Sequence, residues 1–71
     1  MFESVNVPVV VDAGEKIETA VAVYLAEAGA DPREVSWSVS APAGATGGGW
    51  PTVMFAGPAR EIAKIRRKDE G

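Results

Sequence analysis

Two stretches of the chain alternate strictly between apolar and polar residues, a pattern that predicts strands with one buried face. In the N-terminal stretch one face carries Val5, Val7, Val9 and Val11. Its other face includes Pro8, and because proline has no amide hydrogen to donate, we expect this strand at an edge of the sheet. In the second stretch the dry face carries Val35, Trp37 and Val39, and the wet face Ser36, Ser38 and Ser40.

A third strand is predicted at 52–56, where Val53 and Phe55 alternate with Thr52 and Met54. Gly57-Pro58 ends this strand and opens a last helix, since proline is favoured in a first helical turn. The apolar face of that helix carries Pro58, Ile62 and Ile65. We expect the tail, 68–71, to fray.

The segment from Asp12 to Gly29 has the period of a helix with both ends marked. Steps of three and four residues build one buried face from Ile17, Ala20, Val21, Tyr24, Leu25 and Ala28. Asp12 and Glu15 have the spacing of a capping box, so the helix is expected to begin at Asp12. Gly29 suits the left-handed position that ends a helix, and Asp31-Pro32 opens a turn.

The outer face of this helix mixes glutamates with the small or apolar residues Thr19, Ala22, Val23 and Ala26. It is either a solvated helix wall or a shallow packing surface for a second copy or a partner.

Residues 41–51 break the pattern, because Pro42 and several glycines support no regular element. We expect a flexible glycine-rich loop, longer than the about 2–5 residues of an ordinary hairpin connection. Gly44 and Gly49 have the spacing of a phosphate-binding loop, but Trp50-Pro51 and a strand follow instead of a lysine and a helix. A nucleotide-binding loop is therefore not expected.

In chain order these elements predict a single small α+β domain, 1–71, of the type β-α-β-β-α. A strand-helix-strand crossover makes the first two strands parallel, and the third, antiparallel to both, fits between them. The prediction is a three-stranded mixed sheet in the order 1-3-2, with two helices on one face and a wet face left open. This element order resembles a truncated ferredoxin-like arrangement without its fourth strand, a likeness that no sequence motif accompanies.

Composition narrows the chemistry available to this domain. The chain has 71 residues, no cysteine and no histidine, so it forms no disulfide, and a zinc site would need carboxylates alone. A net charge of -3 argues against a general nucleic-acid binder. No apolar run reaches the ~20 residues that span a bilayer, and no secretory signal is evident, so we expect a cytoplasmic protein without membrane contact.

Catalysis would have to rest on Asp12, Glu15, Tyr24, a serine or a lysine. The two acids are explained as helix caps, and a hydroxyl without a positioned base is a poor nucleophile. We expect no enzymatic activity and no cofactor or metal. The open sheet face also lacks the exposed aromatic residues that stack bases in RNA-recognition sheets, which argues against that function. An exposed edge can accept a partner strand, although Pro8 makes this less favourable.

Two features are the predicted partner-binding residues. Trp50, preceded by Gly48 and Gly49, either folds back over the sheet end or contacts a partner, as tryptophan often does at interfaces. Trp37, in contrast, is in phase with the core. The last helix gathers basic residues on one side: Arg60, Lys64, Arg67 and Lys68. They form a solvated helix wall, a contact for nucleic-acid phosphates, or a patch for an acidic protein partner.

The leading hypothesis is a small non-enzymatic protein-interaction module, a dimeric regulator or accessory protein. Its composition resembles that of short reading frames from GC-rich bacteria and their phages. The partner would be a protein, including a second copy bound through the open sheet face or edge. The predicted partner-binding residues are Trp50, Gly48, Gly49, Arg60, Lys64 and Arg67. The alternative is a nucleic-acid-binding accessory protein that uses the basic C-terminal helix; a small-molecule sensor at a subunit interface ranks third.

Overall fold

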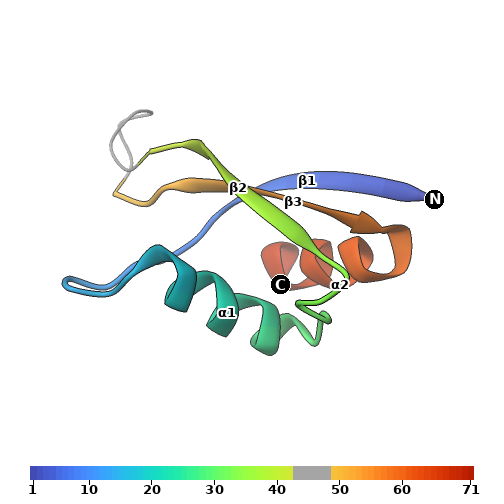
Figure 1. The fold of residues 1–71 in the computed structure, drawn as a ribbon, viewed down its shortest axis with the longest axis horizontal. Helices are drawn as coiled ribbons and strands as arrows, with labels where there is room; N and C mark the ends of the chain where they lie inside the picture. The colour runs from blue at the N-terminus through green and yellow to red at the C-terminus, as the bar shows by residue number, and fades with distance from the viewer. Residues whose placement is uncertain (43–48) are drawn as a thin grey trace.

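The computed structural model describes residues 1–42 and 49–71, and its elements follow the predicted order (Figure 1). The elements are β1 (Phe2–Pro8), α1 (Ile17–Ala28), β2 (Ser36–Ala41), β3 (Thr52–Pro58) and α2 (Ala59–Glu70). Most of the expected glycine-rich loop, including Gly48, lies outside the described residues. The predicted α+β fold is confirmed.

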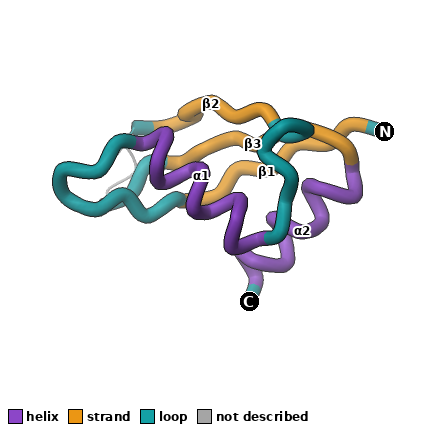
Figure 2. The backbone as a smooth tube through the Cα atoms, turned by 60° about the horizontal axis from the view of Figure 1, so that its bottom comes forward, coloured by secondary structure: helices purple, strands orange, loops and turns teal. Residues whose placement is uncertain are grey.

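The three strands form one sheet in the order β1-β3-β2, as predicted (Figure 2). β3 pairs antiparallel with β1 and antiparallel with β2. The prediction of a mixed sheet was wrong in this respect, because the two parallel strands are never neighbours. Pro8 accordingly lies at the end of an edge strand, where its missing amide costs little.

The register brings the apolar faces of the three strands together. Phe55 lies between Val5 and Trp37, and Val53 lies between Val7 and Val39. Both helices pack on this face of the sheet, and the opposite face stays open (Figure 1). The layers are therefore one sheet and one pair of helices.

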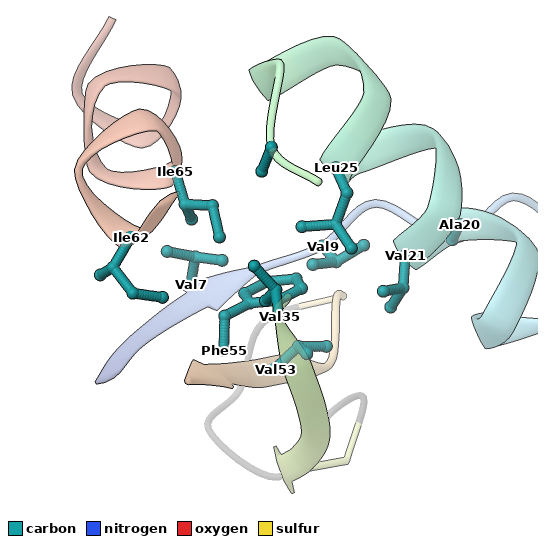
Figure 3. Packing of buried hydrophobic residues seen from close by; sticks show 11 residues of the cluster. Val7, Val9, Ala20, Val21, Leu25, Val35, Val53, Phe55, Ile62 and Ile65 are labelled. Carbon is teal, nitrogen blue, oxygen red and sulfur yellow. The ribbon is translucent and has the colours of Figure 1, made fainter. Parts of the chain in front are cut away.

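The core fills the space between sheet and helices (Figure 3). It consists of Val7, Val9, Ala20, Val21, Leu25, Ala30, Val35, Val53, Phe55, Ile62 and Ile65. Phe55 is fully buried at its centre, and its ring stacks on Tyr24 with centroids 5.6 Å apart. The predicted core faces of β1, α1, β3 and α2 are confirmed, whereas Trp37 is only half-buried against the core.

The expected start of the first helix at Asp12 was wrong, because α1 begins at Ile17 with Lys16 as its N-cap. Asp12 and Glu15 do interact: the Glu15 amide donates to the Asp12 carbonyl at 2.9 Å, and the Asp12 amide donates to Glu15 Oε1 at 3.3 Å. They close a tight turn that contains Gly14 at a φ of 82°. The capping-box spacing was therefore correct as a local contact and misleading as a helix boundary.

The predicted end of α1 is confirmed. Gly29 adopts the left-handed conformation at a φ of 77°, and its amide donates to the Ala26 carbonyl. The Ala30 amide donates to the Leu25 carbonyl at 3.0 Å, and both side chains are buried. These two hydrogen bonds, together with the burial of both side chains, form a Schellman motif, which satisfies the last carbonyls of the helix.

α2 continues through Glu70, so residues 68–70, which we expected to fray, form its last turn. The Gly71 amide donates to the Arg67 carbonyl at 3.0 Å and closes that turn. Neither helix in the described part of the chain has the length and apolar character needed to cross a membrane.

Candidate protein-interaction surface

The open face of the sheet carries no charged side chain. Strand alternation places the following residues on it: Phe2, Ser4, Asn6, Pro8, Ser36, Ser38, Thr52, Met54 and Ala56. Glu3 is the single charged residue in the three strands, and it lies on the helix side, where its carboxylate pairs with Arg66 of α2 at 2.8 Å. All other charges of the domain lie on helices and connections.

Short side chains make this face flat and only weakly polar. Ser4 and Ser36 flank Ala56 in one row, and Asn6 and Ser38 flank Met54 in the next. The Ser36 hydroxyl donates to the Ala56 carbonyl at 3.4 Å, so part of its polarity is satisfied within the sheet. At the end of the face, Phe2 is 76% exposed, so the expectation that this face lacks an exposed aromatic residue was wrong. Depletion of charge with a few exposed apolar residues is typical of the centre of a protein interface.

The outer edge of β1 is shielded. Pro8 ends the strand without an amide to offer, and Arg66 reaches the same strand from α2. Its guanidinium donates to Glu3 Oε1 at 2.8 Å and to the Ser4 carbonyl at 3.3 Å. A proline and a charged side chain are two of the devices by which edge strands avoid pairing with other chains.

Among the described residues, the outer edge of β2 carries neither of these two devices, since Ser36–Ala41 contains no proline and no charged residue. A bulge between Val39 and Ala41, another such device, ends its regular pairing with β3, so the part of this edge without protection is Ser36–Val39. On the helix side, Val39 remains 43% exposed and borders an apolar groove of about 380 Å³. The described residues that line this groove are Val11, Glu15, Ile17, Val39, Pro42, Gly49 and Pro51.

Trp50 and Gly49 lie immediately before β3. Trp50 is 45% exposed, while the next residue, Pro51, is buried and its carbonyl accepts the Val9 amide at 3.1 Å. Pro51 thus fixes the backbone in place, while the side chain of Trp50, the residue before it, stays largely accessible. The partner role assigned to Trp50, Gly48 and Gly49 stays a prediction, and Gly48 is outside the described residues.

The predicted basic face of α2 is largely engaged within the domain. Arg60 forms ion pairs with Glu34 and with Glu61, and Lys64 pairs with Glu61 at 3.2 Å. Lys68 pairs with Glu27 at 3.2 Å and lies over the Tyr24 ring.

Among the described residues, Arg67 is the member of the predicted basic set that forms no ion pair. A surface whose cations already face carboxylates offers little charge to nucleic-acid phosphates.

The two halves of the predicted partner site are also far apart. Trp50 precedes the first residue of β3, and Arg60 follows its last residue. Since a strand rises about 3.3 Å per residue, roughly 20 Å separate them. Among the described residues, Gly49 and Trp50 therefore lie near one end of β3 and the first turn of α2 near the other.

Glu61 is a buried carboxylate that the sequence pattern did not reveal. Its side chain is 3% exposed, accepts the Asp31 amide at 2.9 Å and pairs with Lys64. The hydrogen bond from the Asp31 amide has the larger effect on the pKa of Glu61, and the hydrogen bond from Lys64 the next. Both lower this pKa below its ordinary value of 4.5. Glu61 fixes the turn that leads into β2, so its role is to position that edge strand. The only signal in the sequence was a glutamate one residue before Ile62.

Tyr24 lies against the core on the predicted buried face of α1, and it brings a polar group there. Its hydroxyl is buried and, among the described residues, has no hydrogen-bond partner. Burial, followed by the nearby charge of Asp69, raises the pKa of Tyr24. A hollow of about 270 Å³ lies beside it, between the end of β1 and α1. Within the described residues no group of three acidic side chains is placed to hold a metal ion.

Fold and surface define a small α+β domain with an open, uncharged sheet face. Comparison of the chain with protein-family models, with curated proteins and with solved structures found no match. The likeness to a truncated ferredoxin-like arrangement therefore rests on element order alone.

Proposed function

We propose that this domain is a non-enzymatic protein-interaction module that binds its partner through the open face of the sheet. The observation that carries the proposal is the segregation of charge: the strands contain one charged residue, Glu3, and it lies on the covered side. A surface this flat and this poor in charge loses little on desolvation when a partner covers it.

The partner is a protein with a similarly uncharged surface. Serine, threonine and asparagine on the open face supply short hydrogen-bonding groups, and Phe2 and Met54 supply apolar contact. Trp50, which is 45% exposed two residues before β3, is the expected anchor of this interface, as tryptophan often is. Nucleic-acid binding through α2 is the weaker alternative, because Arg60, Lys64 and Lys68 are already paired with carboxylates.

A capture experiment with matched lysine substitutions tests the proposal. The immobilised domain is exposed to a nuclease-treated lysate of the source cells, and the retained proteins are compared among wild type, Met54→Lys and Ala22→Lys. Met54 is at the centre of the open face, whereas Ala22 is exposed on the outer face of α1. We expect Met54→Lys to weaken retention about tenfold or more, since it buries an unpaired charge in the interface.

Trp50→Ala should weaken the same retention, by about 2 kcal/mol if the indole is a central anchor. Retention that survives Met54→Lys but disappears with Ala22→Lys would place the interface on α1 and overturn the proposal. Retention that depends on nucleic acid, and that replacement of Arg67 abolishes, would favour the nucleic-acid alternative instead.

A further inference from the structure

The unshielded edge of β2 fits one partner in particular, a second copy of the same strand. We infer that two copies of this domain pair β2 against β2 in antiparallel fashion, so that the two sheets join into one of six strands. The inference goes beyond the proposed function, because it concerns the edge of the sheet and not its open face.

The sequence of β2 is complementary to itself under a two-fold axis. With the axis at Ser38, each Ser38 faces the other and Trp37 faces Val39 of the second copy, all within the regular part of the strand before the bulge. In each pair the two residues have the same polarity and lie on the same side of the sheet. Serines meet on the open face, and apolar residues meet on the helix side. An aromatic residue opposite a β-branched residue is among the favourable cross-strand pairs.

Charge also permits this contact. Across a two-fold axis the strand meets a copy of itself, so a charged edge would bring like charges close together. β2 has none within Ser36–Ala41, although the whole chain carries a net charge of -3. The edge is therefore one of the few parts of this acidic domain where two copies approach without repulsion.

Apolar residues of β2 that are partly exposed in one copy become covered by the second copy in the dimer. Val39 is 43% exposed and borders the apolar groove formed with Ile17 and Pro42. Side chains directly opposite one another across a strand pair have Cβ atoms about 5 Å apart, so Trp37 of the second copy comes to lie beside Val39 at this groove. The two-fold axis repeats the contact, and each copy presents one indole and one groove.

The same geometry explains why association stops at two copies. After β2 pairs with β2, the outer edges of the joined sheet are the two β1 strands. Each is shielded by Pro8 and by the bond from Arg66 to the Ser4 carbonyl. One open edge and one shielded edge per copy give a closed dimer, whereas two open edges would give a growing filament.

Matched lysine substitutions on the two edges test the inference with purified protein alone. Ser38 and Asn6 flank the same residue, Met54, on opposite edges of one row, and both are exposed. Sedimentation equilibrium over about a hundredfold range of concentration should show a wild-type dimer. Ser38→Lys should raise its dissociation constant about tenfold or more, because two like charges then meet at the axis, and Asn6→Lys should leave it unchanged.

A second readout uses Val39→Lys, which alters the helix side of the same edge without touching the open face. It should also weaken the dimer, and circular dichroism should show that all three variants keep the fold. A wild-type protein that stays monomeric over the whole range overturns the inference. Equal weakening by Asn6→Lys and Ser38→Lys overturns it too, because that result indicates packing of open face on open face.

The outcomes separate this inference from the proposed function. A monomeric wild type whose capture of partner is lost with Met54→Lys removes the dimer and keeps the function. A dimer that Ser38→Lys disrupts, with capture unaffected by Met54→Lys, keeps the dimer and removes the function.

Discussion

β1 and β2 flank the same central strand, and their wet faces carry short polar residues in matching rows: Ser4 and Ser36 beside Ala56, Asn6 and Ser38 beside Met54. They differ along their outer sides. β1 ends in a proline and accepts a hydrogen bond from an arginine of α2, whereas the described residues give the edge of β2 a bulge alone. The two strands thus carry similar residues on the open face but differ in how readily another chain can pair with their outer edges. The difference comes from the arginine that α2 places beside β1.

The two edges also differ in how they are held to the rest of the domain. β1 is fixed by an exposed ion pair between Arg66 and Glu3. The entry to β2 is fixed from inside, by the buried carboxylate of Glu61 and by close contact between β3 and the Glu34 backbone. The following substitutions should therefore affect the two edges unequally.

The largest effect on stability is expected from Gly57→Ala. A Cβ at Gly57 would lie 2.7 Å from the Glu34 carbonyl oxygen, so the segment leading into β2 must shift. Overpacking of this kind costs about 1–3 kcal/mol of the free energy of unfolding, measurable by urea denaturation. Gly49→Ala is the control, since no atom of the described residues lies within 4 Å of a Cβ there, and it should change stability by less than about 0.5 kcal/mol. Equal stabilities of the two variants would contradict the contact.

Lowering the pH should weaken the attachment of β2 more than that of β1, because Glu61 holds the entry to β2. Its pKa is lowered in the folded protein, so its ionised form stabilises the fold above about pH 4.5, the unfolded value. This contribution is lost as the pH falls from there through the folded pKa. Glu61→Gln lacks it at every pH, so the wild type should be more stable at neutral pH, and the difference in stability should shrink as the pH falls below about 4.5.

Acid should accelerate amide hydrogen exchange chiefly at the entry to β2. The reason is that the Asp31 amide, which donates a hydrogen bond to Glu61, lies before that strand. The pKa of Asp31 is also lowered, chiefly by its bonds with Arg33, but this group is present in both proteins and cancels in the comparison. A gap between wild type and Glu61→Gln that is the same at neutral and acid pH would refute the assignment.

The smallest effect is expected from Arg66→Gln. The Arg66–Glu3 pair is exposed, so its loss should cost only about 0.2–1 kcal/mol of unfolding free energy. Amide exchange along β1 should nevertheless accelerate, because the bond to the Ser4 carbonyl is lost as well. Arg67→Gln, one position on and without an ion pair among the described residues, is the matched control and should leave β1 unchanged.

The sequence was sufficient to predict the sheet order, because the alternation of Val5, Val7, Val53 and Phe55 and the proline in the first strand leave few arrangements. It was also sufficient for the end of α1, since Gly29 satisfies a strict backbone requirement. It misplaced the start of α1, because an aspartate and a glutamate three residues apart bond to each other in a turn as readily as at a helix end.

The candidate surface was less predictable, for a physical reason. A helical wheel shows Arg60, Lys64 and Lys68 together, but it cannot show that Glu34 and Glu27, from other elements, come to lie beside them. The burial of Glu61 depends in the same way on the distant Asp31 amide. Polar pairing across elements is a property of tertiary structure, whereas the absence of charge from β2 can be read directly from Ser36–Ala41.

The position of β3 has a consequence for the order of folding. β1 and β2 bond to β3 and not to each other, and β3 is the last of the three strands in the chain. During synthesis neither earlier strand has its neighbour until residue 58 has left the ribosome. Sheet formation then requires contacts between segments far apart in the chain, which slows folding. β2 therefore stays without its neighbour in the sheet until the last of the three strands has been synthesised.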